Sequence, residues 1–242
     1  MKTIRQSVFE TNSSSMHAIV IPKSMHGHKT DLKQLEIKYN MDFSDRCLIV
    51  HNNPEDKASY IFQIVVKQFI SHFKPVDGSL ETEEHNEFVF RTFKAWMDGF
   101  KGCAKKWRNI DVEFTGFELK REYTSYSGIV QKAYDIVAPS GTYASTGCYG
   151  FDALNAVLMP NMLKKIDDSI NGHDMSYFIK LQPDYWDFDM INILDFVLDP
   201  VATIIQCTDE YTDDEFRDMK NTIRDCAERS DYYCDIIWPA GG

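Results

Sequence analysis

The segment that decides the fold class is VATIIQCTDEYTDDEFRDMKNTIRDCAERSDYYCDIIW, residues 201–238. Its two ends, 201–207 and 234–238, are short apolar runs rich in β-branched residues, which is typical of strands. Between them, Thr212 and Glu215 have the spacing of a helix capping box. The helix that follows runs to Arg229 and carries one apolar face, formed by Phe216, Met219, Ile223 and Cys226. The sequence therefore predicts a strand–helix–strand unit in the C-terminal part of the chain.

Further elements are expected on the N-terminal side of this unit. Residues 53–56 (Asn-Pro-Glu-Asp) form a helix start, because Asn caps, Pro fits the first turn and acids suit the positive end of the helix dipole. Period and composition predict helices over 53–73, 80–100 and 153–170, with a break at Pro160, and strands over 4–9, 16–22, 46–51, 110–119 and 176–182.

Two stretches are less regular. Residues 187–198 fit a helix or a strand equally well, since length and period do not decide between them. Residues 120–150 are rich in Tyr, Ser, Thr and Gly around a short segment 129–137, and we expect a long functional loop there. The prediction is an α+β fold, with mixed α/β as the alternative: a single domain over 1–242 with a central, mostly antiparallel sheet and several helices.

The charge of the chain is concentrated in one half. The 242 residues carry 26 Lys and Arg against 37 Asp and Glu, a net charge of -11. Residues 1–121 hold 18 basic and 16 acidic residues, a net of +2, whereas residues 122–242 hold 8 and 21, a net of -13. An acidic surface of this kind repels nucleic acid and attracts basic partners, although acidity also serves solubility.

The composition is that of a soluble, acidic globular protein, and we expect it to be cytoplasmic. Hydrophobic residues make up 43%, which is ample for a core, and no stretch approaches the ~18 apolar residues of a membrane span. No secretory signal is visible at the N-terminus, so the six cysteines are expected to be reduced. None of them forms a C-x-x-C pair, and the spacing predicts neither a structural zinc site nor another cofactor.

A dense polar run lies between the first two predicted strands. Glu10, Asn12 and Ser13–Ser15 precede His17 by a few residues. Glu10 and His17 can act as an acid–base pair, while the Asn amide and Ser hydroxyls can hold a phosphate. The alternative is a hairpin loop in which Asn and Ser bond their own backbone.

The run VFETNSSSMHAIVI resembles the opening of a group of uncharacterised bacterial and phage proteins, which begin with a similar F-E-T-N-S-S-S-x-H segment. The resemblance covers Arg5 to Ile21, about 17 residues. It implies the context of a phage, prophage or accessory bacterial gene, and it assigns no catalytic residue.

Three further clusters of residues each have a functional and a structural interpretation. His26 and His28, with His17 and His51, supply imidazoles for a metal or lie in ordinary loops and strands. Asp187 and Asp189 either bind Mg²⁺ or lie in the first turn of a helix, where the helix dipole favours acidic side chains. The third cluster is basic, with one aromatic residue, and either contacts nucleic acid or is an ordinary solvated surface. Its members are Lys101, Lys105, Lys106, Trp107 and Arg108.

The chain lacks the P-loop, dinucleotide-binding, zincin, hydrolase-elbow and kinase signatures. We therefore expect an accessory protein of phage or mobile-element type that inhibits a basic, nucleic-acid-handling host protein, as a DNA mimic or an anti-CRISPR does. The carboxylates expected to replace phosphates are those of Asp209, Asp213, Asp214, Asp218, Asp225 and Asp231. The alternative is an enzyme acting on nucleotides or nucleic acid, with Glu10 and His17 as catalytic residues and Asn12, Ser13, Ser14 and Ser15 binding substrate.

Overall fold

Helices and strands both occur along the chain, as the sequence predicts. The computed structural model describes residues 16–21, 31–39, 48–74, 79–126, 129–137, 161–180, 188–200, 202–207 and 235–237. The strands are β1 (Met16–Ile21), β2 (Gln34–Lys38), β3 (Leu48–His51), β4 (Asp111–Thr115), β5 (Glu118–Tyr126), β6 (Ile129–Val137), β7 (Thr203–Cys207) and β8 (Asp235–Ile237). The helices are α1 (Pro54–Ser71), α2 (Leu80–Arg108), α4 (Met162–Asn171), α5 (Ser176–Lys180) and α6 (Phe188–Leu198).

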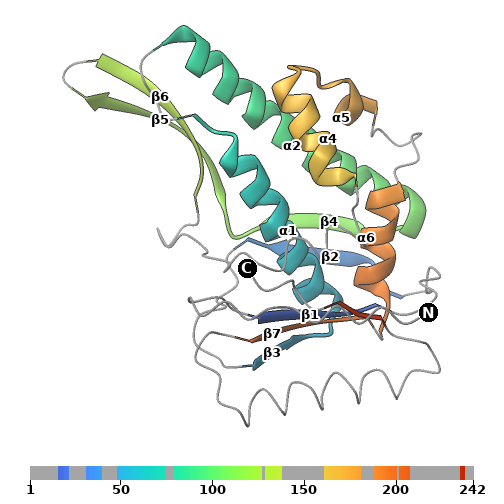
Figure 1. The fold of residues 1–242 in the computed structure, drawn as a ribbon. Coiled ribbons are helices and arrows are strands. Elements are labelled where there is room, and N and C mark those ends of the chain that lie inside the picture. The colour runs from blue at the N-terminus through green and yellow to red at the C-terminus, as the bar shows by residue number, and fades with distance from the viewer. Residues whose placement is uncertain are drawn as a thin grey trace.

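One sheet joins strands from opposite ends of the chain. Its order is β3-β7-β1-β8, and every neighbouring pair is antiparallel. Because β7 and β8 are both antiparallel to β1, they are parallel to each other, with β1 between them. The two strands expected at the ends of the C-terminal unit are therefore present, and the helix expected over 212–229 lies outside the described residues. In Figure 1 this sheet lies at the bottom of the molecule, below α1.

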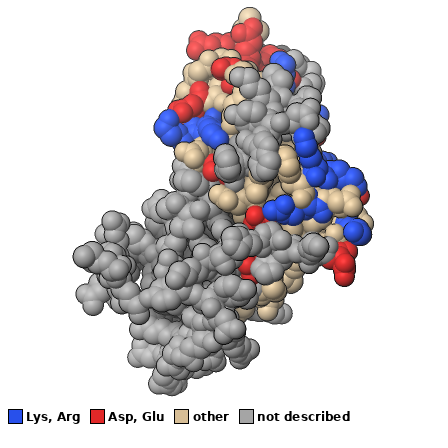
Figure 2. Space-filling view, turned by 90° about the vertical axis from the view of Figure 1, so that its right-hand side faces the viewer, with Lys and Arg blue, Asp and Glu red and all other residues tan. Residues whose placement is uncertain are grey.

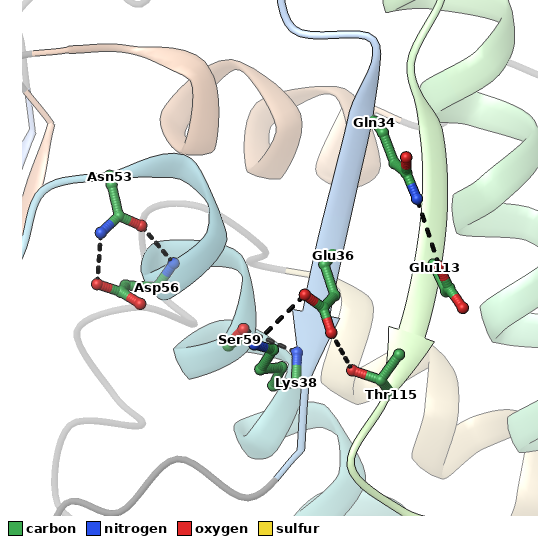
Figure 3. A network of polar contacts seen from close by, with 8 residues as sticks. All are labelled: Gln34, Glu36, Lys38, Asn53, Asp56, Ser59, Glu113 and Thr115. Atoms are coloured by element: carbon green, nitrogen blue, oxygen red, sulfur yellow. Dashed lines mark hydrogen bonds and ion pairs between the residues drawn. The ribbon is translucent and has the colours of Figure 1, made fainter.

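A second, two-stranded sheet lies between this sheet and α2 (Figure 1). Its strands β2 and β4 are parallel, with Glu36 opposite Glu113. Thr115 donates a hydrogen bond to Glu36 across the pair at 2.9 Å, and the Lys38 backbone N–H donates to Ser59 Oγ of α1 at 2.9 Å (Figure 3). The connection is long enough for a parallel pair, because α1, β3 and α2 all intervene between the two strands.

The prediction of one central, mostly antiparallel sheet is wrong. The described strands form three small sheets, of which β2–β4 is a parallel pair and β5–β6 is a separate antiparallel hairpin. The hairpin extends to the upper left of Figure 1, away from the other two sheets. The segment 34–38 is only five residues long and largely polar, so the local pattern predicts neither β2 nor its parallel pairing with β4.

The two long helices begin and end where local chemistry places their termini. Asn53 Oδ1 accepts the Asp56 backbone N–H at 2.8 Å, which confirms the predicted start of α1. Ser79 caps α2 in the same way. Helix α2 continues beyond the predicted residue 100 to Arg108, because Cys103 and Ala104 extend its buried face. It ends at Asn109, whose φ of 55° is left-handed, a conformation that Asn tolerates.

The core lies between α1, α2 and the β2–β4 pair. Phe62 of α1 contacts Phe114 of β4 with ring centroids 4.7 Å apart, and Phe69 contacts Phe93 of α2 at 5.1 Å. The Trp96 indole N–H donates to Met162 Sδ at 3.1 Å, which attaches α4 to the same core. Burying aromatic rings of this size supplies much of the hydrophobic free energy of folding.

The structure also shows the secondary structure of three other segments for which the sequence prediction was wrong or open. Residues 176–182 were predicted as a strand, but 176–180 are helical, since Asp174 accepts the Ser176 backbone N–H at 2.8 Å and starts a turn. Residues 118–126 and 129–137, most of which were expected in a loop over 120–150, pair as the antiparallel strands β5 and β6, and residues 138–150 lie outside the described residues. Residues 188–198 are helical. No helix in the described ranges has both the length and the apolar character needed to cross a membrane.

Candidate functional site

The sequence-predicted sites fall largely outside the described residues. Glu10, Asn12, Ser13, Ser14 and Ser15 lie there, and so do the six predicted partner-binding aspartates, Asp209, Asp213, Asp214, Asp218, Asp225 and Asp231. His17 is in β1, where the register places it opposite Gln206 of β7. The proposed pairing of Glu10 with His17 therefore stays a prediction.

The described members of the predicted metal clusters have structural contacts. His51 ends β3, is 1% exposed, and packs against Tyr60 with the two rings tilted and their centroids 5.6 Å apart. Asp189 lies in the first turn of α6 and accepts the Asn161 backbone N–H at 3.1 Å, as the helix-start reading of this residue predicts. His26, His28 and Asp187 are outside the described residues. Within the described ranges, no group of three His, Cys, Asp or Glu side chains is arranged to hold a metal ion.

The most unusual ionisable group is Lys57, which is fully buried in α1. Its ammonium donates to the backbone carbonyls of Phe196 at 3.2 Å, Asp199 at 2.6 Å and Ala202 at 2.9 Å. Burial lowers the pKa of Lys57 to about 8, and the nearby Asp199 carboxylate partly opposes this shift. The three carbonyls use all three donors of the ammonium, so Lys57 closes the C-terminal end of α6 rather than presenting a nucleophile.

A second polar group joins α1 to α4. Asp167 Oδ1 accepts from Gln68 Nε2 and lies at the same 2.6 Å from His72 Nε2. The His85 ring donates to the His72 carbonyl at 2.9 Å, and its centroid is 5.7 Å from that of His173. Three imidazoles and one carboxylate thus meet where α1 ends. Each contact joins two different elements of the chain, so this group stabilises the packing of the helices.

The basic cluster predicted over 101–108 is distributed over the last turns of α2. Arg108 contacts Asp195 of α6 through two of its nitrogens, and Lys105 pairs with Asp111 at 2.8 Å. Lys101 lies over the Phe114 ring, with its nitrogen 5.6 Å from the centroid, and Lys106 lies over Trp107 at 5.1 Å. Figure 2 shows Lys and Arg side chains in more than one area of the described surface, the larger one at the right and another at the upper left.

The exposed side of α2 carries more charge than the sequence pattern indicated. We call it the outer face of α2 and define it by Glu84, Glu87, Arg91, Lys94, Asp98, Lys101 and Lys105. The sequence analysis identified only its last two lysines. The spacing of Glu84, Arg91, Asp98 and Lys105, seven residues each, was the signal that could have revealed the rest. This face is the largest set of charged side chains that one described element presents to solvent.

The chain matches no protein-family model, no curated protein sequence and no solved structure.

Proposed function

We propose that this protein binds and inhibits a basic, nucleic-acid-handling protein through its acidic C-terminal half. The observation that carries the proposal is the charge difference between the halves, +2 for residues 1–121 and -13 for residues 122–242. Carboxylates at roughly regular helical spacing resemble the phosphates of a nucleic acid in charge, so they occupy a groove that is lined by Lys and Arg.

The proposal gains support from the buried polar groups of the described core. Lys57, Asp189 and Asp199 all bond to the protein's own backbone. Arg108 and Asp195 pair with one another. These side chains are used in holding helices together, which fits a protein that acts through its surface.

The test is an affinity capture with tagged protein from bacterial lysate, washed at increasing salt. A basic nucleic-acid-binding protein should be retained at low salt and released as screening shortens the range of the charges. The variant Asp225→Lys with Asp231→Lys removes predicted contact residues. It should reduce capture by at least about tenfold, because each reversal replaces an attraction with a repulsion.

The matched control makes the same change in net charge elsewhere. Asp31 and Glu113 are exposed in the N-terminal half, so Asp31→Lys with Glu113→Lys should leave capture within about twofold of the unmodified protein. Equal capture by both double variants, or capture that is insensitive to salt, contradicts the proposal.

A further inference from the structure

The outer face of α2 has a regular alternation of charge. Glu84, Arg91, Asp98 and Lys105 are all exposed and are each seven residues apart. Since seven residues make nearly two helical turns, the four side chains lie in one row along the helix. The signs along this row are negative, positive, negative, positive.

The helix dipole does not account for the middle of this row, and no ion pair among the described residues includes its two central members. The dipole favours acids in the first turn and bases in the last turn, where Glu81 and Lys105 lie. Arg91 and Asp98 are near the centre of the helix. They are about 10 Å apart along its axis, too far to pair with each other. Within the described ranges neither forms a salt bridge, although both are exposed.

We propose that the outer face of α2 binds the same face of a second copy of this chain, with the two helices antiparallel. A twofold axis between residues 94 and 95 places Arg91 opposite Asp98 of the second copy, and Glu84 opposite Lys105 of the second copy. Each contact occurs twice because the interface is symmetric. Glu87 then lies beside Lys101 of the second copy, so this neighbouring pair also has opposite charges.

The direction of pairing follows from the signs. Parallel helices in register would place Arg91 against Arg91 and Asp98 against Asp98, which is repulsive along the whole row. The antiparallel arrangement is attractive for Arg91 with Asp98, Glu84 with Lys105 and Glu87 with Lys101, while Lys94 lies beside the axis and faces Lys94 of the second copy. Ala95, next to the axis, is small and half-buried, so the helices can approach closely at the centre. The dimer is independent of the proposed function, because it uses the described N-terminal half and not the acidic half.

The experiment is sedimentation equilibrium of the full chain at about 0.1 M salt, where exposed charges at contact still interact. The unmodified protein should reach dimer mass as its concentration increases. Arg91→Asp and Asp98→Arg should each raise the dissociation constant at least about tenfold, because each change creates two like-charge contacts in the symmetric interface.

Charge exchange then distinguishes this interface from any other. An equimolar mixture of R91D and D98R should dimerise, because both of its central contacts are again between opposite charges. The double variant R91D/D98R has the same amino-acid composition as the unmodified protein, and it should form a homodimer without a second variant. The controls Lys164→Asp and Asp168→Lys make the same changes of charge on α4 and should dimerise like the unmodified protein, since this exposed pair is not part of the outer face of α2.

Two results overturn the proposal. One is a protein that stays monomeric at all concentrations under these conditions. The other is a dimer that R91D does not weaken, or that the mixture and the double variant fail to restore. A thermal unfolding curve for each variant, matching that of the unmodified protein, shows that lost association is not lost folding.

Discussion

The ammonium of Lys57 lies 2.6 Å from the backbone carbonyl oxygen of Asp199, although 142 residues separate them in the chain. The contact ties the first third of the chain to the end of α6. The carbonyls of Phe196 and Ala202 complete the set of acceptors, and the Asp199 carboxylate accepts the Ala202 backbone N–H at 3.2 Å. Carbonyls that follow the last turn of a helix lack intrahelical partners, so a buried cation at this place supplies the missing donors.

Replacing Lys57 with Met should destabilise the protein by about 3 kcal/mol, because it leaves three buried carbonyls without donors and one buried carboxylate without a counter-charge. The measurement is the free energy of unfolding in urea. The exposed Lys164→Met variant is the control, and its unfolding midpoint should be unchanged. A Lys57→Met protein as stable as the unmodified one would show that the three carbonyls do not depend on this cation.

The same lysine predicts a pH dependence. Burial lowers the pKa of Lys57 to about 8 in the folded protein, against its ordinary value of 10.5. Between these two values the unfolded chain binds more protons than the folded one, so stability increases with pH over this window and is level below it. The stability of the unmodified protein relative to K57M should therefore increase from pH 8 to pH 10.

The pH scan has an upper limit set by Tyr60. Burial raises the pKa of this phenol, so above about pH 10 the unfolded chain ionises and the folded one does not. The stability of both proteins falls there, so the comparison is made below pH 10, where Tyr60 is un-ionised in the folded and the unfolded chain. A stability difference between the two proteins that stays constant from pH 8 to 10 would contradict the predicted shift of Lys57.

The ion pair between Arg108 and Asp195 should couple α2 to α6. Both side chains are mostly buried, with 22% and 12% of their surface exposed. A double-mutant cycle with Arg108→Ala and Asp195→Ala should give a coupling energy of about 1–2 kcal/mol. The exposed pair Lys105–Asp111 is the matched control and should give about 0.5 kcal/mol or less. Equal coupling in the two cycles would mean that burial does not strengthen the first pair.

Gln63 is expected to be a site where a substitution stabilises the protein. It is 2% exposed, and neither its Nε2 nor its Oε1 has a hydrogen-bond partner in the described part of the chain. Gln63→Met has nearly the same volume and removes this desolvation cost, so it should gain about 1–2 kcal/mol in urea unfolding. The same substitution at Gln68 removes the bond to Asp167 and should lower stability. Loss of stability at both positions would refute the assignment for Gln63.

Asp167 should control how firmly α4 packs on α1. Asp167→Ala removes the acceptor of Gln68 and the partner of His72 in one step. We expect a loss of about 1–2 kcal/mol and faster hydrogen exchange of the α4 backbone amides. Its neighbour Asp168 pairs only with the exposed Lys164 among the described residues, so Asp168→Ala should leave exchange in α4 unchanged. Identical exchange in the two variants would exclude this role for Asp167.

Local signals in the sequence predicted the long helices well. The start of α1 at Asn53 and Pro54 follows from residues that are adjacent in the chain, and the structure confirms the capping bond. The strand residues 203–207 were likewise evident from their β-branched composition. By contrast, Tyr177-Phe178-Ile179 has strand-forming composition, and only the turn that Asp174 starts makes it helical.

The remaining errors concern contacts between distant residues. The parallel pairing of β2 with β4 joins residues 77 positions apart, for example Gln34 with Asp111, and no local pattern encodes it. The burial of Lys57 is likewise not evident from local sequence, because its acceptors are backbone carbonyls, which any residue provides. Of the candidate surface, the sequence identified the lysines after residue 100 but not the alternating row that begins at Glu84.

The four-stranded sheet has a consequence for the order in which the protein is made. Strand β1 is synthesised before its neighbours β7 and β8, which come from residues 203–207 and 235–237. Neither edge of β1 can therefore form its native pairing until residues 203–207 have been made. During that interval its backbone N–H and C=O groups are open to pairing with other chains, which makes this segment the point at which a nascent molecule most needs a chaperone.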